Sequence, residues 1–171
     1  MKEHKEYQIY LVDDDRLYLN MLEHSLKRLA GAKTDLKTFV TGEECLREIN
    51  ETPPDIVILD YYLNSIRKDA MNGIKVLNQI KMANKSIQVI MLSNQEKLDV
   101  AVACIKSGAY DYIVKNDSAL LRIRHHINLI QDHIDLRKKM RFYTNSNIIL
   151  ASLFMAFLLS MVIYAWRRSL L

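Results

Sequence analysis

The chain has 171 residues, of which 50% are hydrophobic and 26% charged, with only four Gly and two Pro. This composition predicts a folded domain with a core and excludes collagen-like, low-complexity and disordered chains. The formal net charge is +4, but residues 137–171 contain six cations and no acid, so the basic excess flanks the last apolar segment and forms no patch elsewhere. We therefore expect no nucleic-acid partner.

Short apolar runs alternate with longer helical patterns over most of the chain. In chain order, the patterns predict a strand at 7–12, a helix at 15–30, a strand at 34–40, a helix opened by Thr41, a strand at 55–60, a helix from Asn72 or Gly73 to about 83, a strand at 86–93, a helix at 95–107, a strand at 110–114 and a helix at about 118–141. Glu44 completes a capping box with Thr41. The order of five strand–helix pairs predicts an α/β fold with a doubly wound parallel sheet.

Polar side chains stand where these predicted strands end. In open α/β sheets, ligands bind outside the carboxyl ends of the strands, near the point where the strand order reverses. The residues selected by this rule are Asp13, Asp14 and Asp15 after the first strand, Asp60 at the end of the third, Ser93 at the end of the fourth and Lys115 after the fifth.

Clustered carboxylates repel one another unless a cation joins them, and a hard divalent ion, Mg²⁺ by default, suits oxygen ligands. One carboxylate of such a site can act as a nucleophile toward phosphorus and form an acyl phosphate. A lysine can then offset the charge on the transferring oxygens.

Five motifs in this order resemble the response regulator receiver domain of two-component signalling, a CheY-like family. They are Leu-Val-Asp-Asp-Asp (11–15), Ile-Val-Ile-Leu-Asp (56–60), Met-Asn-Gly (71–73), Met-Leu-Ser-Asn (91–94) and Gly-Ala-Tyr-Asp-Tyr-Ile-Val-Lys (108–115). The resemblance covers roughly residues 6–130. It implies a five-stranded flavodoxin-like sheet with the strand order 2-1-3-4-5.

The resemblance also implies a role for each matching residue. Asp60 would accept the phosphoryl group, Asp13, Asp14 and the backbone carbonyl of Tyr62 would hold Mg²⁺, Ser93 and Tyr112 would form the switch, and Lys115 would contact the phosphoryl group. The implied protein is not an enzyme but a phospho-accepting regulator in a phosphorelay, with a histidine kinase or a histidine phosphotransfer protein as its donor. Two alternatives are a membrane scaffold with a receiver-like domain that is not phosphorylated and a magnesium-dependent phosphohydrolase.

The end of the chain predicts a membrane anchor, because residues 142–166 carry no charge. We expect a receiver domain at 1–130, a helical juxtamembrane linker at 131–145, a transmembrane helix at 146–167 and a short tail at 168–171. Four cations shortly before the span against two after it place the receiver on the cytoplasmic side of the inner membrane, with the lipid bilayer as a partner.

A homodimer through the 120–134 helix is a further hypothesis. Five apolar residues alternate there at spacings of three and four, as in a coiled-coil seam: Leu120, Ile123, Ile127, Ile130 and Ile134.

Overall fold

The fold was analysed in a computed structural model that describes residues 7–30, 34–63 and 71–169. Its five strands are β1 (Tyr7–Val12), β2 (Thr34–Phe39), β3 (Ile56–Asp60), β4 (Gln88–Ser93) and β5 (Asp111–Val114). All neighbouring strands are parallel, in the order β2-β1-β3-β4-β5. The predicted doubly wound sheet and its strand order are confirmed.

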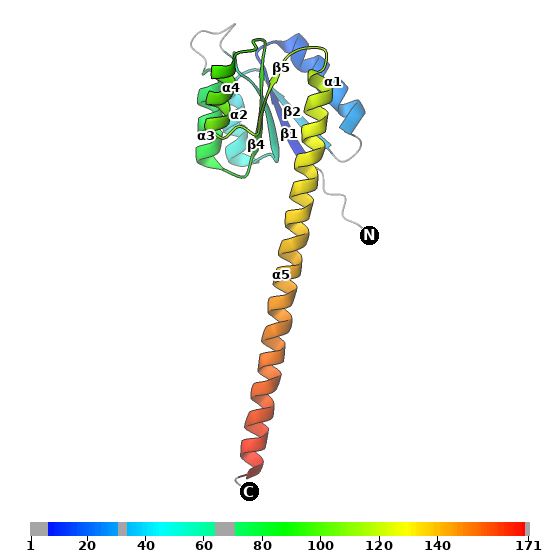
Figure 1. Ribbon diagram of the computed structural model, residues 1–171, viewed down its shortest axis with the longest axis vertical. Helices are drawn as coiled ribbons and strands as arrows, with labels where there is room; N and C mark the ends of the chain where they lie inside the picture. The colour runs from blue at the N-terminus through cyan, green and yellow to red at the C-terminus, as the bar shows by residue number, and fades with distance from the viewer. Residues whose placement is uncertain (1–6, 31–33, 64–70, 170–171) are drawn as a thin grey trace. The chain divides into compact units, whose positions relative to one another are not determined.

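Five helices connect or follow the strands: α1 (Arg16–Ala30), α2 (Gly42–Glu51), α3 (Gly73–Ala83), α4 (Leu98–Lys106) and α5 (Ala119–Ser169). Figure 1 shows α2, α3 and α4 on one face of the sheet, with α1 and the first turns of α5 on the other. The chain divides into two compact units, Met1–Leu129 and Ile130–Leu171. The predicted segment boundaries within 131–171 remain predictions.

Side-chain caps fix where two helices of the first unit begin. The Thr41 hydroxyl accepts a hydrogen bond from the Glu44 amide at 3.2 Å, as the capping pattern predicted, and the Asn72 side chain accepts one from the Lys75 amide at 3.1 Å. These oxygens pair with amides that have no acceptor within the helix. The start of α3 therefore follows from a polar residue next to the end of β3.

The buried strands contribute side chains to two hydrophobic layers, one on each face of the sheet. This is because successive side chains of a strand point to opposite faces. Val57 and Leu59 belong to a core cluster with residues of α2, α3 and α4. Ile56 and Ile58 therefore point to the other face, where Figure 1 places α1 and the start of α5. Cys45 and Cys104 are free thiols, and both are fully buried.

The structure does not support the expected membrane anchor. The predicted span at 146–167 lies within α5, yet no helix in the described parts of the chain is long and apolar enough to cross a membrane. The expected inner-membrane localisation and the bilayer as a partner are withdrawn with the anchor.

Most of the apolar residues predicted to form a homodimer seam at 120–134 are buried. Ile123, Ile127 and Ile130 are at most 2% exposed. Side chains buried within one copy cannot pack against a second one without unfolding part of the first. The 3-4 spacing of these residues reflects packing within the chain.

Close packing between α2 and α3 gives a testable consequence at Gly42. A Cβ added there would overlap with Cγ2 of Val76, which is fully buried. We expect Gly42→Ala to destabilise the protein by about 1–3 kcal/mol through overpacking. Urea unfolding of the single and double variants should show that Val76→Ala relieves about 1 kcal/mol of this loss.

Ile80→Ala, one turn further along α3, supplies the matched control, because Ile80 is equally buried and does not meet the added Cβ. Its effect should simply add to that of Gly42→Ala. Equal coupling with both partners would contradict the packing argument.

Candidate functional site: an acidic pocket at the strand ends

One lysine joins the ends of three strands. Lys115 Nζ lies 2.6 Å from Asp13 Oδ2 and 2.7 Å from Asp60 Oδ1, and all three side chains are at least 92% buried. The Lys115 amide donates to the Ser93 carbonyl at 2.8 Å, which fixes the start of this loop against the end of β4. Two acids 47 residues apart in sequence thus share one cation.

Backbone contacts hold the two buried carboxylates in place. The Asp13 amide donates to the Phe39 carbonyl at 3.1 Å, and Asp13 Oδ1 accepts from the Asp15 amide at 3.0 Å. Asp60 is the last residue of β3, and its Oδ2 accepts from the Tyr62 amide at 2.9 Å. Each carboxylate is therefore oriented by a turn that directly follows its own strand.

A third acid completes a cluster that could hold a cation. Asp13, Asp14 and Asp60 each offer an oxygen, and these oxygens lie within 4.8 Å of one another. The donors are hard carboxylate oxygens, the type that Mg²⁺ prefers. The residues therefore fit a magnesium ion, and receiver domains in general bind it through this kind of acidic pocket.

Burial disfavours the charged forms of Asp13, Asp60 and Lys115. Burial and the neighbouring Asp60 raise the pKa of Asp13 from 3.8 to about 6, although Lys115 opposes the shift. Burial also raises the pKa of Asp60, again against Lys115. For Lys115, burial alone would lower the pKa, but Asp60 and Asp13 outweigh it and raise the pKa. The single positive charge of Lys115 does not fully compensate the negative charges of Asp13 and Asp60. An added cation would compensate the remainder.

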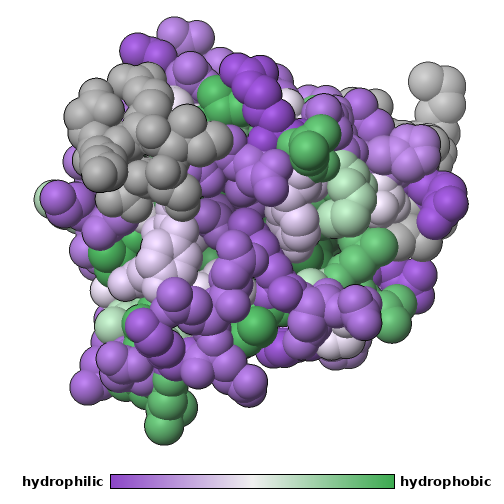
Figure 2. Space-filling model, turned by 90° about the horizontal axis from the view of Figure 1, so that it is seen from above, coloured by the Kyte–Doolittle hydropathy of each residue, from purple (hydrophilic) through white to green (hydrophobic). Residues whose placement is uncertain are grey.

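The cluster opens into a pocket of about 480 Å³. Figure 2, which looks onto this end of the first unit, shows a predominantly hydrophilic surface. The lining residues are Asp13, Asp14, Asp15, Arg16, Leu17, Tyr18, Asp60, Tyr62, Asn94 and Lys115. Of the predicted site residues, five contribute to this lining.

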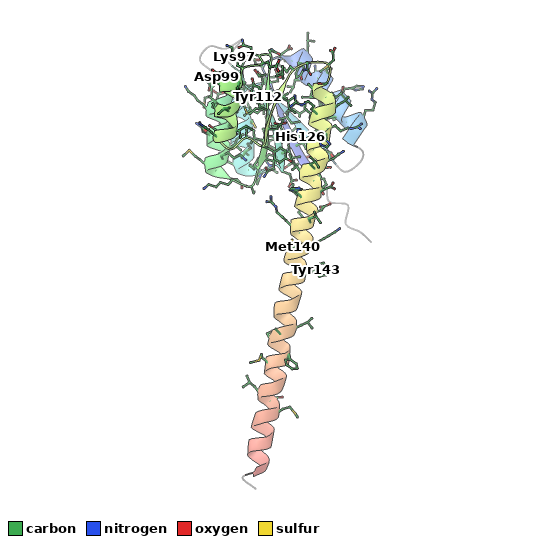
Figure 3. All side chains as sticks on the ribbon, in the orientation of Figure 1. Lys97, Asp99, Tyr112, His126, Met140 and Tyr143 are labelled. Carbon is green, nitrogen blue, oxygen red and sulfur yellow. The ribbon has the colours of Figure 1, made fainter. Side chains whose placement is uncertain are left out.

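The other two predicted residues, Ser93 and Tyr112, are not among the lining residues. Ser93 is fully buried, and its hydroxyl accepts from the Gln95 amide at 3.2 Å. The Tyr112 hydroxyl donates to the Gln95 carbonyl at 2.7 Å (Tyr112 is labelled in Figure 3). Both predicted switch residues therefore meet at the loop that follows β4.

Sequence reasoning missed Gln95 and Tyr18. The Tyr62 hydroxyl donates to Gln95 Oε1 at 2.9 Å, so Gln95 connects the pocket lining with Ser93 and Tyr112. Lys115 Nζ lies 4.5 Å from the centre of the Tyr18 ring, a cation–π distance. The position of Gln95 two residues after a strand end was a usable signal, whereas nothing in the spacing pointed to Tyr18.

The backbone of α3 approaches the site closely at Gly73. Its amide donates to the Tyr61 carbonyl at 2.9 Å, and a Cβ there would overlap with the Asp60 carbonyl oxygen. A glycine is therefore required where the helix passes the end of β3.

This fold and pocket define an α/β domain with a cluster of acids and one lysine at the carboxyl ends of its parallel strands. The response regulator receiver domain family matches residues 9–126, more than half of the chain, and the chain belongs to that family.

Curated relatives share the receiver part only. The DNA-binding transcriptional regulator NtrC of Escherichia coli is 35% identical over 107 residues, which cover 63% of this chain and 21% of NtrC. The transcriptional regulatory protein PrrA of Mycobacterium leprae is 34% identical over 108 residues, covering 63% of this chain and 43% of PrrA. The chain thus matches less than half the length of either regulator.

Solved receiver domains share the fold. The signal receiver domain of a putative Luxo repressor protein from Vibrio parahaemolyticus superposes with a TM-score of 0.67 at 23% identity, covering 78% of this chain and 95% of that domain. The receiver domain of NtrX from Brucella abortus gives a TM-score of 0.59 at 28% identity, covering 69% and 95%.

The crowded acids predict that Asp13→Asn stabilises the metal-free protein. The pKa of Asp13 is raised on folding from 3.8 to about 6, so stability is lost as pH rises through this interval. At pH 7 the variant should be more stable by about 1–2 kcal/mol, a figure reduced for the lost contact with Lys115. Chemical unfolding in the presence of a chelator measures this.

The gain should shrink toward pH 4, where Asp13 of the parent protein is protonated in the folded state. Asp15→Asn, at an exposed neighbouring position, should change stability little at either pH. A parent protein as stable as Asp13→Asn at pH 7 would contradict the repulsion argument.

Proposed function

We propose that this chain accepts a phosphoryl group on Asp60 and signals through phosphorylation-dependent protein contacts. The observation that carries the proposal is the position of Lys115 Nζ between Asp13 and Asp60, next to an open pocket. A carboxylate beside a cation and accessible from a pocket can act as a nucleophile toward phosphorus.

In the proposed reaction, an Asp60 carboxylate oxygen forms a bond to phosphorus while the bond to the donor's leaving atom breaks. For a phosphohistidine of a histidine kinase or a phosphotransfer protein, the leaving atom is an imidazole nitrogen. Lys115 stays beside the new acyl phosphate and offsets the charge of its oxygens. The product carries its phosphoryl group on a carboxylate that is 97% buried, so the charge change is felt by the surrounding loops.

Asp13, Asp14 and the carbonyl of Tyr62 would hold Mg²⁺. Bound there, the ion supplies charge neutralisation for the phosphoryl oxygens. The side chains of Asp13 and Asp14 are the support for this assignment, since their oxygens lie with that of Asp60 inside one 4.8 Å cluster. The role of the Tyr62 carbonyl rests on the position of Tyr62 in the pocket lining.

Ser93 and Tyr112 would form the switch that reports phosphorylation. Both side chains contact the backbone of Gln95. Movement of the Ser93 hydroxyl toward a phosphoryl oxygen would therefore change the position of the loop to which Tyr112 is bonded. The loop leads directly into α4. The output would then be a changed contact surface around α4 and β5.

The test is phosphorylation of the full chain by a small acyl phosphate donor with Mg²⁺, followed by intact-mass measurement. We expect one phosphate adduct on the parent protein and none on Asp60→Asn. Asp55→Asn, at the opposite end of the β3 segment, is the matched control and should retain the adduct. Chelation of the metal should slow the reaction, because the ion neutralises the phosphoryl oxygens.

No adduct on a folded parent protein would contradict the proposal and favour a receiver-like domain that binds partners without phosphorylation. Release of inorganic phosphate from many donors, at a rate well above the decay of the Asp60 adduct, would instead favour a phosphohydrolase.

A further inference from the structure

Tyr18, in the first turn of α1, lies next to the buried ammonium group of Lys115. Lys115 Nζ stands over the Tyr18 ring, 4.5 Å from its centre, and both residues line the acidic pocket. An ammonium group within about 6 Å of a ring centre is attracted to the negative face of the ring, most strongly when the ammonium group is desolvated. The Lys115 side chain is only 8% exposed, so this condition is met.

A second contact between a lysine and a tyrosine in the first unit has a weaker geometry. Lys37 Nζ lies 5.8 Å from the centre of the Tyr10 ring, and the Lys37 side chain is 38% exposed. Water competes with the ring for an ammonium group that is this accessible. The contact between Tyr18 and Lys115 is shorter and less hydrated, and it is therefore the stronger of the two.

The backbone of Tyr18 is held by the same turn that orients Asp13. Asp15 Oδ1 accepts hydrogen bonds from the Leu17 and Tyr18 amides at 2.9 Å and 3.2 Å, which pairs two free amides at the start of α1. The Asp15 amide donates to Asp13 Oδ1 at 3.0 Å, and Asp13 Oδ2 contacts Lys115. The contacts thus run from Asp13 through this turn to the Tyr18 ring and return through Lys115.

Tyr18 meets Lys115 as a neutral ring. Burial raises the pKa of the Tyr18 hydroxyl above its ordinary value of 10.0, although Lys115 opposes the shift. A neutral phenol forms no ion pair with a lysine, so the attraction comes from the aromatic face. Phenylalanine should therefore replace Tyr18 in this contact, whereas leucine, which is apolar but has no aromatic face, should not.

We propose that Tyr18 is a positioning residue for the transfer of a phosphoryl group to Asp60, on the basis of the function proposed for that residue. The ring keeps the Lys115 ammonium group between the strand ends, where it meets the oxygens of the entering phosphoryl group. Without the ring, the ammonium group is free to turn into the open pocket, and it neutralises those oxygens less effectively. Tyr18 therefore acts on the reaction through Lys115.

The rate of phosphorylation of the full chain tests this role, with a small acyl phosphate donor, Mg²⁺ and intact-mass measurement of the Asp60 adduct over time. We expect Tyr18→Leu to form the adduct about tenfold more slowly than the parent protein, a loss in the range of a desolvated cation–π contact. Tyr18→Phe should restore most of the rate. Met21→Leu, about one turn further along α1 at a half-exposed position outside the pocket lining, is the matched control and should leave the rate unchanged.

A second background separates positioning of the lysine from a general effect on the fold. In Lys115→Ala the ammonium group is absent, so adding Tyr18→Leu should slow the remaining reaction by less than about twofold. A merely structural role of Tyr18 would lower the rate by the same factor with and without Lys115.

NMR spectra of the metal-free full chain give a readout that does not depend on phosphorylation. The methylene protons beside Lys115 Nζ lie near the face of the Tyr18 ring, and the ring current should shift their resonances upfield. The shift should persist in Tyr18→Phe and disappear in Tyr18→Leu. The same spectra show whether each variant is folded.

An unchanged rate in Tyr18→Leu, or an equal loss in both lysine backgrounds, would overturn the role of Tyr18 while phosphorylation of Asp60 stood. The absence of an upfield shift in the parent protein would overturn it as well. A folded parent protein that forms no adduct at all would instead contradict the proposed function, and the role of Tyr18 would fall with it.

Discussion

The site depends on one electrostatic constraint: two buried carboxylates from different strands must share a single ammonium group. Asp13 and Asp60 both lie within 2.7 Å of Lys115 Nζ, and burial raises the pKa of each acid despite this contact. Together with Asp14, these acids form a cluster that could hold a further cation. The stability penalty and the proposed chemistry thus have the same physical origin.

The fold supports this constraint through short connections on one edge of the sheet. Each functional side chain lies at or just after the end of its own parallel strand. A movement of one strand end is therefore passed to the neighbouring strand end through only a few contacts. Gln95 is an example, since its backbone meets Ser93 and Tyr112 while its side chain meets Tyr62. We regard this residue as the connection between the pocket and the start of α4.

The two units have different sources of order. The first is stabilised by hydrophobic layers on both faces of a sheet, with strands that are almost fully buried. The second consists of helix alone, and many of its described apolar side chains are exposed. The hydrogen bonds of an isolated helix make it only marginally stable in water.

The sequence by itself determined the sheet and most of the pocket. Asp13, Asp60 and Lys115 each stand directly at a strand end, and the parallel order brings strand ends to one edge whatever the details of packing. The caps at Thr41 and Asn72 are likewise local, because each bond spans three residues.

Only the tertiary structure decided what depends on distance and exposure. It showed that Gln95 and Tyr18 join the site, that Ile123 and Ile127 face the interior, and that the described part of α5 has no stretch fit to cross a membrane. Apolar spacing looks the same in a helix packed on a sheet, in a coiled-coil seam and in a membrane span. The difference lies in what covers each face, and burial is set by contacts between residues far apart in the chain.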